Sequence, residues 1–453
     1  MRGKRRRRRI GRYTITGILG HGGMGTVYRA VMPTTNRTVA LKLLNPSEPL
    51  TALLGMPALR DIFSTEVLTM ARLRHPHIAD IRDFDYDGKN PFYTMEYYCA
   101  NLGMMIDEKF TLESPTRRIP PDKVLAWGAQ ILDGLGCMHS AGVVHRDIKP
   151  QNMLVTDENT IKICDFGMSL DMEEGSGPSA PGMRVGTPYY AAPEQAADPD
   201  RADERSDLFS AGVLLYRLLT GELPVMKGFM LSLVNPLYDQ GWDDFFARAL
   251  SWKPERRFQN AAEMAAALMT LELHRQKHSR RICRDIAADQ RPSSRHGLRD
   301  TPIRASGGRA GNLFGVDSLW QPRTYIRNMF APPEEHIVLD EATRLLWQRA
   351  GSACPVDRPE AERLIAAWNG AGFGGITAWR LPTVNELLSL IPDPTLPESE
   401  CGPAPFTGER EWFWSCDRRS RKTSWYVNTR LGYAGWQDDG CRYFVRAVAS
   451  SPV

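Results

Sequence analysis

The sequence predicts an α+β protein with a two-lobed unit, first rich in strands and then in helices, and a small second α+β domain. Three observations lead to this prediction. Between Tyr13 and Lys42, β-branched and aromatic residues form strand-like runs on either side of a glycine cluster. Residues Asp122–Ser140 instead carry apolar side chains at helical spacing. Eight of the eleven tryptophans lie between Trp320 and Trp436, which indicates a separate C-terminal domain.

Composition places the chain among globular proteins with more than one core. It has 453 residues, of which 42% are hydrophobic and 24% are charged. The formal net charge of +4 is unevenly spread, because Arg2, Lys4 and Arg5–Arg9 contribute seven positive charges and Arg275–Arg309 contributes a net seven. The remainder is therefore acidic. We expect a solvated, disordered basic tail at residues 1–11, with weak contact of its charges with nucleic acid or an anionic membrane as the alternative.

Targeting and metal signals are few. No apolar run is long enough to predict a membrane span, and no apolar stretch of a secretory signal follows the arginine-rich start. We therefore expect a cytoplasmic protein. The eight cysteines form no CxxC pair, which disfavours a thiolate zinc site. His75 and His77 flank a proline at the end of a helical segment, and we interpret them as a structural turn.

The glycine cluster GHGGMG occupies residues 20–25 and contains a GxGxxG pattern, a weak signal when taken alone. A dinucleotide-binding turn would open a helix, whereas Thr26–Val31 is strand-like. A glycine hairpin that folds its backbone over phosphates fits better. Lys42 follows on the next predicted strand, where it can reach those phosphates.

A helical segment and an extended connector come next. Residues Pro57–Leu73 have helical spacing and include Glu66, which needs a cation if it faces inward. We expect Lys42 to be that cation, with an exposed glutamate as the alternative. Pro91–Tyr98 is strand-like and leads into a connector between the lobes, where an adenine could pair with backbone groups. Met95 would border that pocket or simply fill a buried strand position.

The string GVVHRDIKPQN at Gly142–Asn152 carries the most chemical information. An Asp five residues before an Asn suits phosphoryl transfer, in which a carboxylate faces the substrate hydroxyl while an amide oxygen holds a metal. Lys149 lies between Asp147 and Asn152 and can neutralise charge on a migrating phosphoryl group. A solvated charged turn is the alternative for an isolated HRD tripeptide, but the partners of this string elsewhere in the chain favour catalysis.

Four features follow the string. A short predicted hairpin between Met153 and Ile163 ends at Asp165, the first residue of DFG, where a carboxylate can bind magnesium that bridges phosphates. GTPYYAAPE at Gly186–Glu194 closes a long loop. Asp207 begins an apolar helix that we expect to be buried. Arg257 is the expected buried ion-pair partner of the glutamate that ends GTPYYAAPE.

Residues 12–276 resemble a protein kinase catalytic domain, close to the bacterial, eukaryotic-like serine/threonine kinases. GHGGMG with Val27, VALK, the helix glutamate, HRDIKPQN, DFG and APE occur in the family's order. The resemblance implies a bilobal kinase fold with a β-rich N-lobe and an α-rich C-lobe. It also implies ATP and Mg²⁺ as cofactors and transfer of the γ-phosphoryl group to Ser/Thr hydroxyls of protein substrates.

The same resemblance implies a role for each catalytic-loop residue. Asp147 would orient the substrate hydroxyl or accept its proton. Lys149 would stabilise the transferring phosphoryl group, and its presence marks Ser/Thr rather than Tyr specificity. Asn152 and Asp165 would hold magnesium.

For the nucleotide, the resemblance implies that Lys42 grips the α- and β-phosphates and that Glu66 positions Lys42. Residues 20–25 would cover the phosphates, and Glu96–Tyr98 would form the adenine hinge. The implied nucleotide-binding residues are Leu19, Gly20, Gly22, Gly25, Val27, Ala40, Lys42, Glu66, Met95, Glu96 and Tyr98.

The loop after DFG offers a regulatory hypothesis. Arg146 of HRD is typical of kinases whose activation loop is ordered by phosphorylation, because a phosphate dianion could pair with it. Plain flexibility of a Gly/Pro-rich loop is the alternative, and the loop lacks the pair of threonines expected of bacterial relatives. Thr187 is expected to brace Asp147 and Lys149 rather than to be modified. The candidate sites of autophosphorylation, which would involve a dimer, are Ser169, Ser176 and Ser179.

The C-terminal part begins after a change in composition. Residues 277–318 are rich in Arg, Ser, Gly and Pro, and we expect a basic flexible linker there. In residues 319–453, strings such as WRLPT within Ala371–Leu390 resemble the Lcl C-terminal domain family, which implies a C-type-lectin-like α+β fold. The formylglycine-generating sulfatase-modifying fold uses a similar string, but its catalytic cysteine pair is not evident.

A binding role is our hypothesis for this C-terminal domain. Several proteins with such folds display a loop-rich binding face, and the segment Arg418–Asp439 is the candidate here for contact with an unidentified ligand or protein. The alternative is that its aromatic residues belong to the core. The aromatic residues concerned are Trp425, Tyr426, Tyr433 and Trp436.

The sequence therefore predicts a serine/threonine protein kinase with a C-terminal binding or sensor domain. The competing class is a catalytically silent ATP-binding scaffold that acts through the lectin-like domain. The complete set of Lys42, Asp147, Asn152 and Asp165 argues against it, since a silent relative usually lacks at least one. A surface adhesin is disfavoured by the missing export signal.

Overall fold

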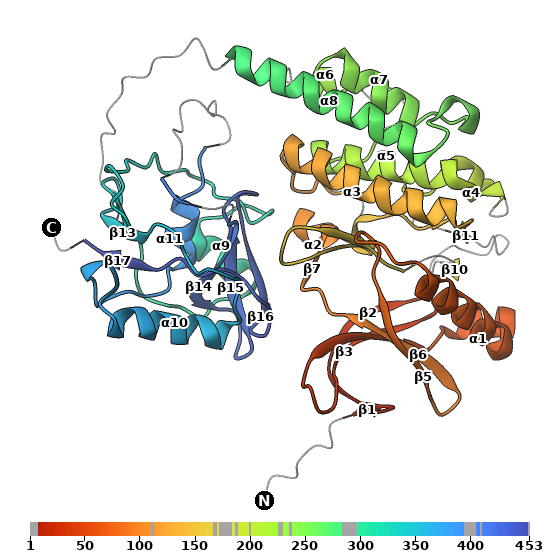
Figure 1. The fold of residues 1–453 in the computed structure, drawn as a ribbon, viewed down its shortest axis with the longest axis horizontal. Coiled ribbons are helices and arrows are strands. Elements are labelled where there is room, and N and C mark those ends of the chain that lie inside the picture. Colours follow the sequence, from red (N-terminus) through yellow and green to blue (C-terminus); the bar gives the residue numbers. More distant parts are fainter. Residues whose placement is uncertain are drawn as a thin grey trace, which may run out of the picture. The chain divides into compact units, whose positions relative to one another are not determined.

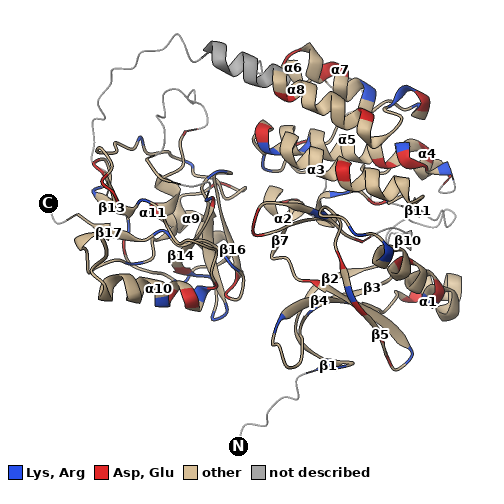
Figure 2. Ribbon diagram, in the orientation of Figure 1, with Lys and Arg blue, Asp and Glu red and all other residues tan. Residues whose placement is uncertain are grey.

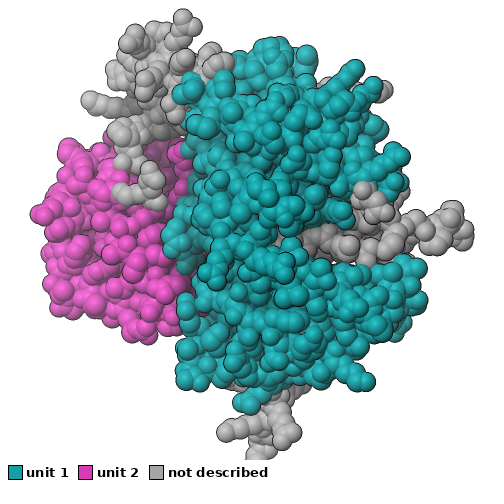
Figure 3. All heavy atoms as spheres, turned by 45° about the vertical axis from the view of Figure 1, so that its right-hand side comes forward, with its two compact units in different colours: residues 1–277 teal, residues 278–453 magenta. Residues whose placement is uncertain are grey.

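The computed structural model describes two compact units, residues 1–277 and residues 278–453 (Figure 3). In the described part of the chain, no helix combines the length and the apolarity that crossing a membrane requires. The described residues are 8–109, 113–165, 170–171, 184–185, 189–198, 201–224, 230–234, 238–282, 297–393, 405–407 and 410–451.

The first unit starts with a six-stranded antiparallel sheet in the order β1-β2-β3-β4-β6-β5, and α1 packs against β5 and β6 (Figure 1). Helix α1 bends at Gly55, whose φ of 74° is not helical, just before Pro57. The elements are β1 (Arg9–Ile10), β2 (Tyr13–Gly22), β3 (Gly25–Val31), β4 (Thr38–Leu44), α1 (Glu48–Arg72), β5 (Ile81–Asp87) and β6 (Asn90–Glu96).

Strand alternation gives this sheet two buried faces, as the β-branched and aromatic runs predicted. Tyr28 and Leu41 belong to a cluster on one face, together with Ile10 and Phe92. Residues of the other face, which include Tyr93, pack together with the buried side of α1. The side chains carried by the second face therefore lie between the sheet and the helix that contains Glu66.

The predicted N-terminal tail of residues 1–11 is wrong at its end. Arg9 and Ile10 form β1 and pair with β2, and the Ile10 side chain is fully buried. The guanidinium of Arg8 lies 5.4 Å from the centroid of the Tyr28 ring. A single isoleucine after a run of arginines is enough to anchor the strand, because burying it stabilises the sheet. Residues 1–7 lie outside the described residues.

Helices dominate the rest of this unit, and α3 runs beside α5 (Figure 1). The close packing depends on Gly128, where a Cβ atom would lie 2.8 Å from Leu268 and 3.0 Å from Leu215. The predicted amphipathic helix at 122–140 is confirmed by α3. The helices are α2 (Leu102–Ile106), α3 (Pro121–Ser140), α4 (Pro193–Ala197), α5 (Glu204–Thr220), α6 (Leu231–Val234), α7 (Gln240–Ala249) and α8 (Ala261–Ile282).

Short strands line the junction of the two lobes. The predicted hairpin is confirmed, and its strands continue a three-stranded sheet in the order β7-β8-β9. A 3₁₀ turn at Pro150–Asn152 leads directly into β8. The strands are β7 (Ala100–Asn101), β8 (Met153–Val155), β9 (Ile161–Ile163) and the pair β10 (Leu170–Asp171) and β11 (Arg184–Val185).

The predicted ion pair between Glu194 and Arg257 is present and bidentate. The Nη1 and Nη2 atoms of Arg257 lie 2.6 and 2.7 Å from the Oε1 and Oε2 atoms of Glu194. The Arg257 side chain is fully buried, and the Ser206 hydroxyl donates a third hydrogen bond to Glu194. The pair therefore links the start of α4 to the segment before α8.

The second unit contains two three-stranded sheets, in the orders β12-β13-β17 and β14-β15-β16. Helix α11 packs against all three strands of the sheet β14-β15-β16. Charged residues of both signs lie along α10 (Figure 2), where Arg358 and Glu362 form an ion pair. The elements are α9 (Gly307–Phe314), β12 (Ile337–Asp340), β13 (Leu345–Gln348), α10 (Arg358–Gly370), α11 (Val384–Ser389), β14 (Trp412–Arg418), β15 (Thr423–Asn428), β16 (Tyr433–Asp438) and β17 (Val448–Ser450).

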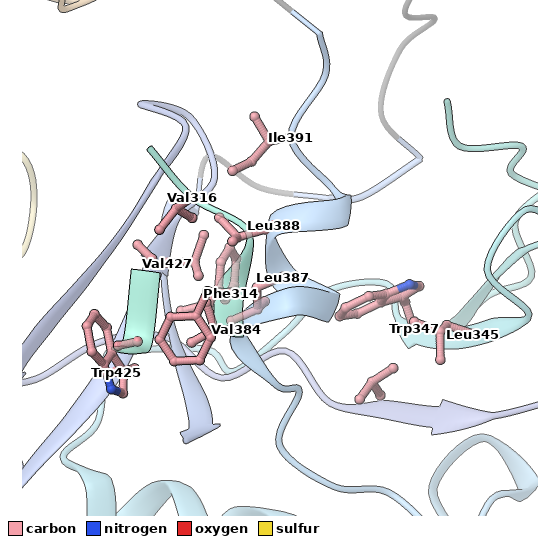
Figure 4. Packing of buried hydrophobic residues seen from close by; sticks show 14 of the residues in the cluster. Phe314, Val316, Leu345, Trp347, Val384, Leu387, Leu388, Ile391, Trp425 and Val427 are labelled. Carbon is pink, nitrogen blue, oxygen red and sulfur yellow. The ribbon is translucent and has the colours of Figure 1, made fainter. Parts of the chain in front are cut away.

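The predicted linker of residues 277–318 is wrong for residues 297–318. Phe314 and Val316 are buried in the same core cluster as Trp425 (Figure 4). Arg299 forms two hydrogen bonds with the fully buried Asp417 carboxylate, at 2.9 and 2.7 Å. The few apolar residues of this basic segment therefore fold with the C-terminal domain, which starts earlier than the predicted residue 319. Composition averaged over the segment concealed them.

The hypothesis of an aromatic binding face at Arg418–Asp439 is also wrong for most of its residues. Trp425 is buried in the cluster that contains Leu387 of α11. Tyr426 and Tyr433 are buried on the opposite face of the same sheet, where both rings contact Trp412. Trp436 is partly buried. Its ring meets that of Trp425 edge to face, with 5.3 Å between the centroids, and the Arg419 guanidinium lies over it. These aromatic residues therefore build the core of the domain.

We predict that Arg257→Met lowers the free energy of unfolding by about 3 kcal/mol, because it leaves the Glu194 carboxylate unpaired at a largely buried site. Burial alone would raise the pKa of Glu194, but hydrogen bonds from Arg257 and Ser206 hold it below its ordinary value of 4.5. The contribution of the pair is therefore present above pH 4.5 and is lost as the pH falls below it.

Denaturant unfolding at several pH values measures this effect. Arg256→Met is the matched control, because Arg256 is exposed on the same turn. Equal stabilities of the two variants near neutral pH would contradict the prediction.

Candidate active site

The Lys42 ammonium is the meeting point of three elements. It lies 2.8 Å from the Oδ1 atom of Asp165, just after β9, and 3.4 Å from the Oε1 atom of Glu66 on α1. The predicted contact between Lys42 and Glu66 is therefore present. Lys42 faces α1 because it occupies the same face of β4 as Ala40, which packs in the cluster beneath the helix.

Electrostatics keep this cluster ionised at Lys42 and Asp165. Burial alone would lower the pKa of Lys42, but the negative charges of Asp165 and Glu66 raise it well above its ordinary value. Burial would raise the pKa of Asp165, but Lys42 and hydrogen bonds from Lys42 and Tyr93 lower it. The pKa of Glu66 is raised, because burial and the nearby Asp165 outweigh the attraction of Lys42.

Asp147 lies within a second network that its own loop supplies. Its Oδ2 atom is 2.8 Å from the Lys149 ammonium and accepts a hydrogen bond of 2.8 Å from the Asn152 amide nitrogen. The same amide nitrogen donates to the backbone carbonyl of Asp147. Because the amide nitrogen of Asn152 is engaged on Asp147, its Oδ1 atom is the side that remains for a metal ligand.

A buried carboxylate from α5 fixes the backbone of the loop. Asp207 accepts hydrogen bonds of 2.8 Å from the backbone N–H groups of His145 and Arg146. Arg146 has a φ of 68°, a left-handed conformation that a residue with a side chain adopts only when neighbours hold it. The predicted burial of Asp207 is confirmed, and this side chain therefore determines the course of the chain into Asp147.

The imidazole of His145 connects the loop to the strand end at Asp165. One ring nitrogen accepts a hydrogen bond from the Asp147 N–H, and the other lies 3.1 Å from the Cys164 carbonyl. Burial lowers the pKa of His145, so the ring is neutral and can accept at one nitrogen while it donates from the other. Asp165 itself has a φ of 55°, also in the left-handed region.

The glycine hairpin joins β2 to β3, and β3 pairs with the strand that carries Lys42. The strands β2 and β3 pair up to Gly22 and Gly25, and a two-residue turn joins them. A Cβ atom on Gly25 would lie 2.3 Å from the Leu43 carbonyl, whereas no atom lies within 4 Å of one on Gly20 or Gly22. Gly25 is thus needed for packing, and the other two leave the hairpin open to a ligand.

Sheet register places the remaining predicted nucleotide contacts. Val27 pairs with Lys42 and Ala40 pairs with Met95, so these side chains share one face. Leu19, at the edge of the hairpin, is 44% exposed. At the end of β6, the Glu96 carboxylate pairs with Arg82 at 2.8 Å and accepts a hydrogen bond from the Tyr98 hydroxyl.

Residues 13–290 match the protein kinase domain family, and residues 336–449 match the Lcl C-terminal domain family. The chain belongs to the protein kinase family. PksC, a serine/threonine-protein kinase of Streptomyces coelicolor, is 36% identical over 274 residues, which cover 56% of this chain and 48% of that protein. PknL, a serine/threonine-protein kinase of Mycobacterium tuberculosis, is 33% identical over 271 residues, which cover 57% of this chain and 65% of that protein.

The chain thus spans roughly half to two thirds of the length of these curated relatives. Among solved structures, the kinase domain of Mycobacterium tuberculosis PknI is 26% identical and covers 60% of this chain and 99% of that domain, with a TM-score of 0.45. The bilobal arrangement of a sheet-rich lobe and a helical lobe is that of the kinase fold. The C-type-lectin-like character of the second unit stays a prediction.

The donor set of this kinase domain fits magnesium. Asn152 offers an amide oxygen and Asp165 a carboxylate, the hard ligands that Mg²⁺ takes together with phosphate oxygens and waters. Among the described residues, no group of three or more His, Cys, Asp or Glu side chains could hold a metal ion. A metal at Asn152 and Asp165 would therefore depend on ligands supplied by the nucleotide, as in other phosphoryl-transfer sites.

Some predicted features lie outside the described residues. They are Phe166 and Gly167 of DFG, the expected brace Thr187, and the candidate phosphorylation sites.

One contact of the site was not predicted. Tyr93, which donates a hydrogen bond to Asp165, was not predicted. Its sequence signal is weak, because Tyr93 is one of several polar residues in β6, which also contains Thr94 and Glu96.

We predict that Gly25→Ala lowers the free energy of unfolding by about 2 kcal/mol, because its Cβ atom would collide with the Leu43 carbonyl. Gly22→Ala is the matched control in the same hairpin and should change stability by less than about 0.5 kcal/mol. Chemical denaturation measures both variants. A Gly25→Ala protein as stable as Gly22→Ala would contradict the steric argument.

Proposed function

We propose that this chain is a cytoplasmic serine/threonine protein kinase that transfers the γ-phosphoryl group of ATP to hydroxyl groups of protein substrates. The observation that carries the proposal is the contact of the Lys42 ammonium with both Glu66 and Asp165. It brings a cation from the sheet-rich lobe to a carboxylate of the helical lobe. That arrangement is required for a triphosphate to be held between the lobes.

The catalytic loop supplies the groups that would act on the substrate. Asp147 presents a carboxylate whose orientation is fixed by Lys149 and Asn152, so it can orient a serine or threonine hydroxyl and accept its proton. Lys149 lies beside that carboxylate, where its ammonium group would stabilise negative charge on the transferring phosphoryl group. In this proposal both side chains act by positioning and electrostatics.

The nucleotide would be held by residues that the sheet register brings together. Lys42 would bind the α- and β-phosphates, with Glu66 fixing its ammonium group. Ala40 and Met95 would border the adenine, and the side chains of Glu96 and Tyr98 are engaged with each other, which leaves the hinge backbone to pair with the base. Magnesium, held by Asn152 and Asp165, would neutralise charge on the phosphates.

A silent ATP-binding scaffold is the alternative class. It would tolerate a damaged catalytic loop, but here Asp147, Lys149 and Asn152 form a complete network of short contacts. The buried Asp207 and His145 maintain that network from behind. A scaffold has no use for this arrangement, so active catalysis is the function that we propose.

For the C-terminal unit we propose a sensor or substrate-recruitment role. The match to the Lcl C-terminal domain family supports a distinct module, whose ligand we leave unassigned because the proposed aromatic face is core. Autophosphorylation in a dimer, and weak contacts of the basic segments with nucleic acid or anionic membranes, remain hypotheses. Most residues that they involve lie outside the described residues.

We predict that Asp147→Asn lowers the rate of phosphoryl transfer by at least about 100-fold while ATP still binds, because the variant loses the proton acceptor but keeps the shape of the loop. Wild type and variant are incubated with labelled ATP, magnesium and a cell lysate, and labelled serine and threonine residues are identified by mass spectrometry.

Glu158→Gln is the control for this assay, because Glu158 is an exposed carboxylate in the nearby turn between β8 and β9. It should label the lysate like wild type. Equal labelling by wild type and Asp147→Asn would reject the proposed role of Asp147. If wild type binds ATP but labels no protein, the scaffold is favoured.

We predict that deletion of residues 297–453 changes which lysate proteins are labelled but leaves ATP hydrolysis within about threefold of wild type, because the two units have separate cores. Quantitative mass spectrometry compares the labelled proteins. Unaltered substrate choice and cellular location would contradict a sensor or recruitment role for this unit.

A further inference from the structure

Tyr93 lies directly opposite the active-site lysine. It is the cross-strand partner of Lys42 in the pairing of β4 with β6, and its side chain is fully buried. Its hydroxyl donates a hydrogen bond of 3.2 Å to the Oδ1 atom of Asp165. The Lys42 ammonium lies 5.8 Å from the centroid of its ring.

The ring and the hydroxyl of Tyr93 have separable environments. The ring packs in the cluster beneath α1 and contacts Phe63, with 5.6 Å between ring centroids. A phenylalanine would satisfy that packing without bringing a polar group into the cluster. The hydroxyl needs a hydrogen-bond partner when it is buried, and Asp165 accepts from it. The hydroxyl therefore acts on the carboxylate and not on the core.

Both hydrogen bonds that Asp165 accepts at Oδ1 come from the face of the sheet that carries Lys42 and Tyr93. Lys42 donates one at 2.8 Å and Tyr93 the other at 3.2 Å. Within the described part of the chain, no residue donates a hydrogen bond to Oδ2 of the same carboxylate. Two donors on one oxygen fix the rotation of the carboxylate and turn the second oxygen away from them.

We propose that Tyr93 is a positioning residue for Asp165, whose hydroxyl orients the carboxylate so that its second oxygen binds the magnesium of the nucleotide. This inference rests on the proposed kinase function. It resembles the general case in which a hydrogen bond to a metal-binding side chain sets its orientation. Tyr93 also contacts Phe63, one turn before Glu66 on α1, so the same ring touches the helix that positions Lys42.

The test compares Tyr93→Phe, which removes only the hydroxyl, with Tyr28→Phe. Tyr28 is a buried tyrosine of β3 that packs in the cluster on the opposite face of the sheet. ATP binding to the full chain is measured by calorimetry, first with a chelator and then over a series of magnesium concentrations. Steady-state KM and kcat are measured alongside.

We expect Tyr93→Phe to bind ATP like wild type when magnesium is absent. The magnesium concentration that half-saturates the ATP complex should rise about tenfold, the usual cost of removing a hydrogen bond that orients a metal ligand. Tyr28→Phe should show no such rise. An unchanged magnesium requirement in Tyr93→Phe overturns the proposal, and so does a loss of ATP affinity that is equal with and without magnesium, which would indicate a packing role.

Two further measurements separate the possible failures. Tyr93→Met also lacks the hydroxyl and fills the same apolar space. The magnesium titration is interpreted for whichever of Tyr93→Phe and Tyr93→Met has the melting temperature of wild type. If neither variant folds, the side chain is structural and the proposal is overturned. If wild type itself neither binds ATP with magnesium nor phosphorylates protein, the proposed function fails. If wild type is active and Tyr93→Phe has the same magnesium requirement, only the role of Tyr93 is rejected.

Discussion

The ion pair between Lys42 and Asp165 is the interaction on which the rest of the kinase unit depends. Through it, a strand of the sheet-rich lobe contacts a chain segment that belongs to the helical lobe. The Lys42 and Asp165 side chains are 15% and 30% exposed, so separating them would leave two partly buried charges without their partner. Glu66 adds a second carboxylate from α1. The relative positions of the sheet, helix α1 and the segment at Asp165 are thus linked through one ammonium group.

Behind this ion pair, buried polar groups determine the backbone of the site. Asp207 accepts hydrogen bonds from the N–H groups of His145 and Arg146, where the chain adopts a left-handed conformation. The His145 ring connects the N–H group of Asp147 to the carbonyl of Cys164. Such hydrogen bonds are strong because water does not compete for them. The carboxylate of Asp147 is therefore presented on a rigid loop, which catalysis by positioning requires.

Sequence patterns predicted those parts of the site whose residues belong to a short motif. The pairing of Lys42 with Glu66 could be predicted, because a glutamate on the inward side of a helix requires a cation. Arg257 lies in the charged stretch KPERRF and could be named only as a candidate partner of Glu194. The contact of Tyr93 with Asp165 could not be predicted, since a tyrosine within a strand has no spacing that identifies its partner. Ile10 and Phe314 were missed for another reason: they lie in segments rich in arginine and glycine, whose average composition predicts flexibility.

The sequence by itself determined the order of strands and helices in the kinase unit and the identity of its charged groups, because these depend on local periodicity and on fixed motifs. Only the tertiary structure decided which residues are covered. Trp425 and Tyr433 lie in the core and not on a binding face, and residues 297–318 belong to a folded domain. Periodicity shows that a strand has two faces, but burial depends on what packs against each face, and that is a property of the whole chain.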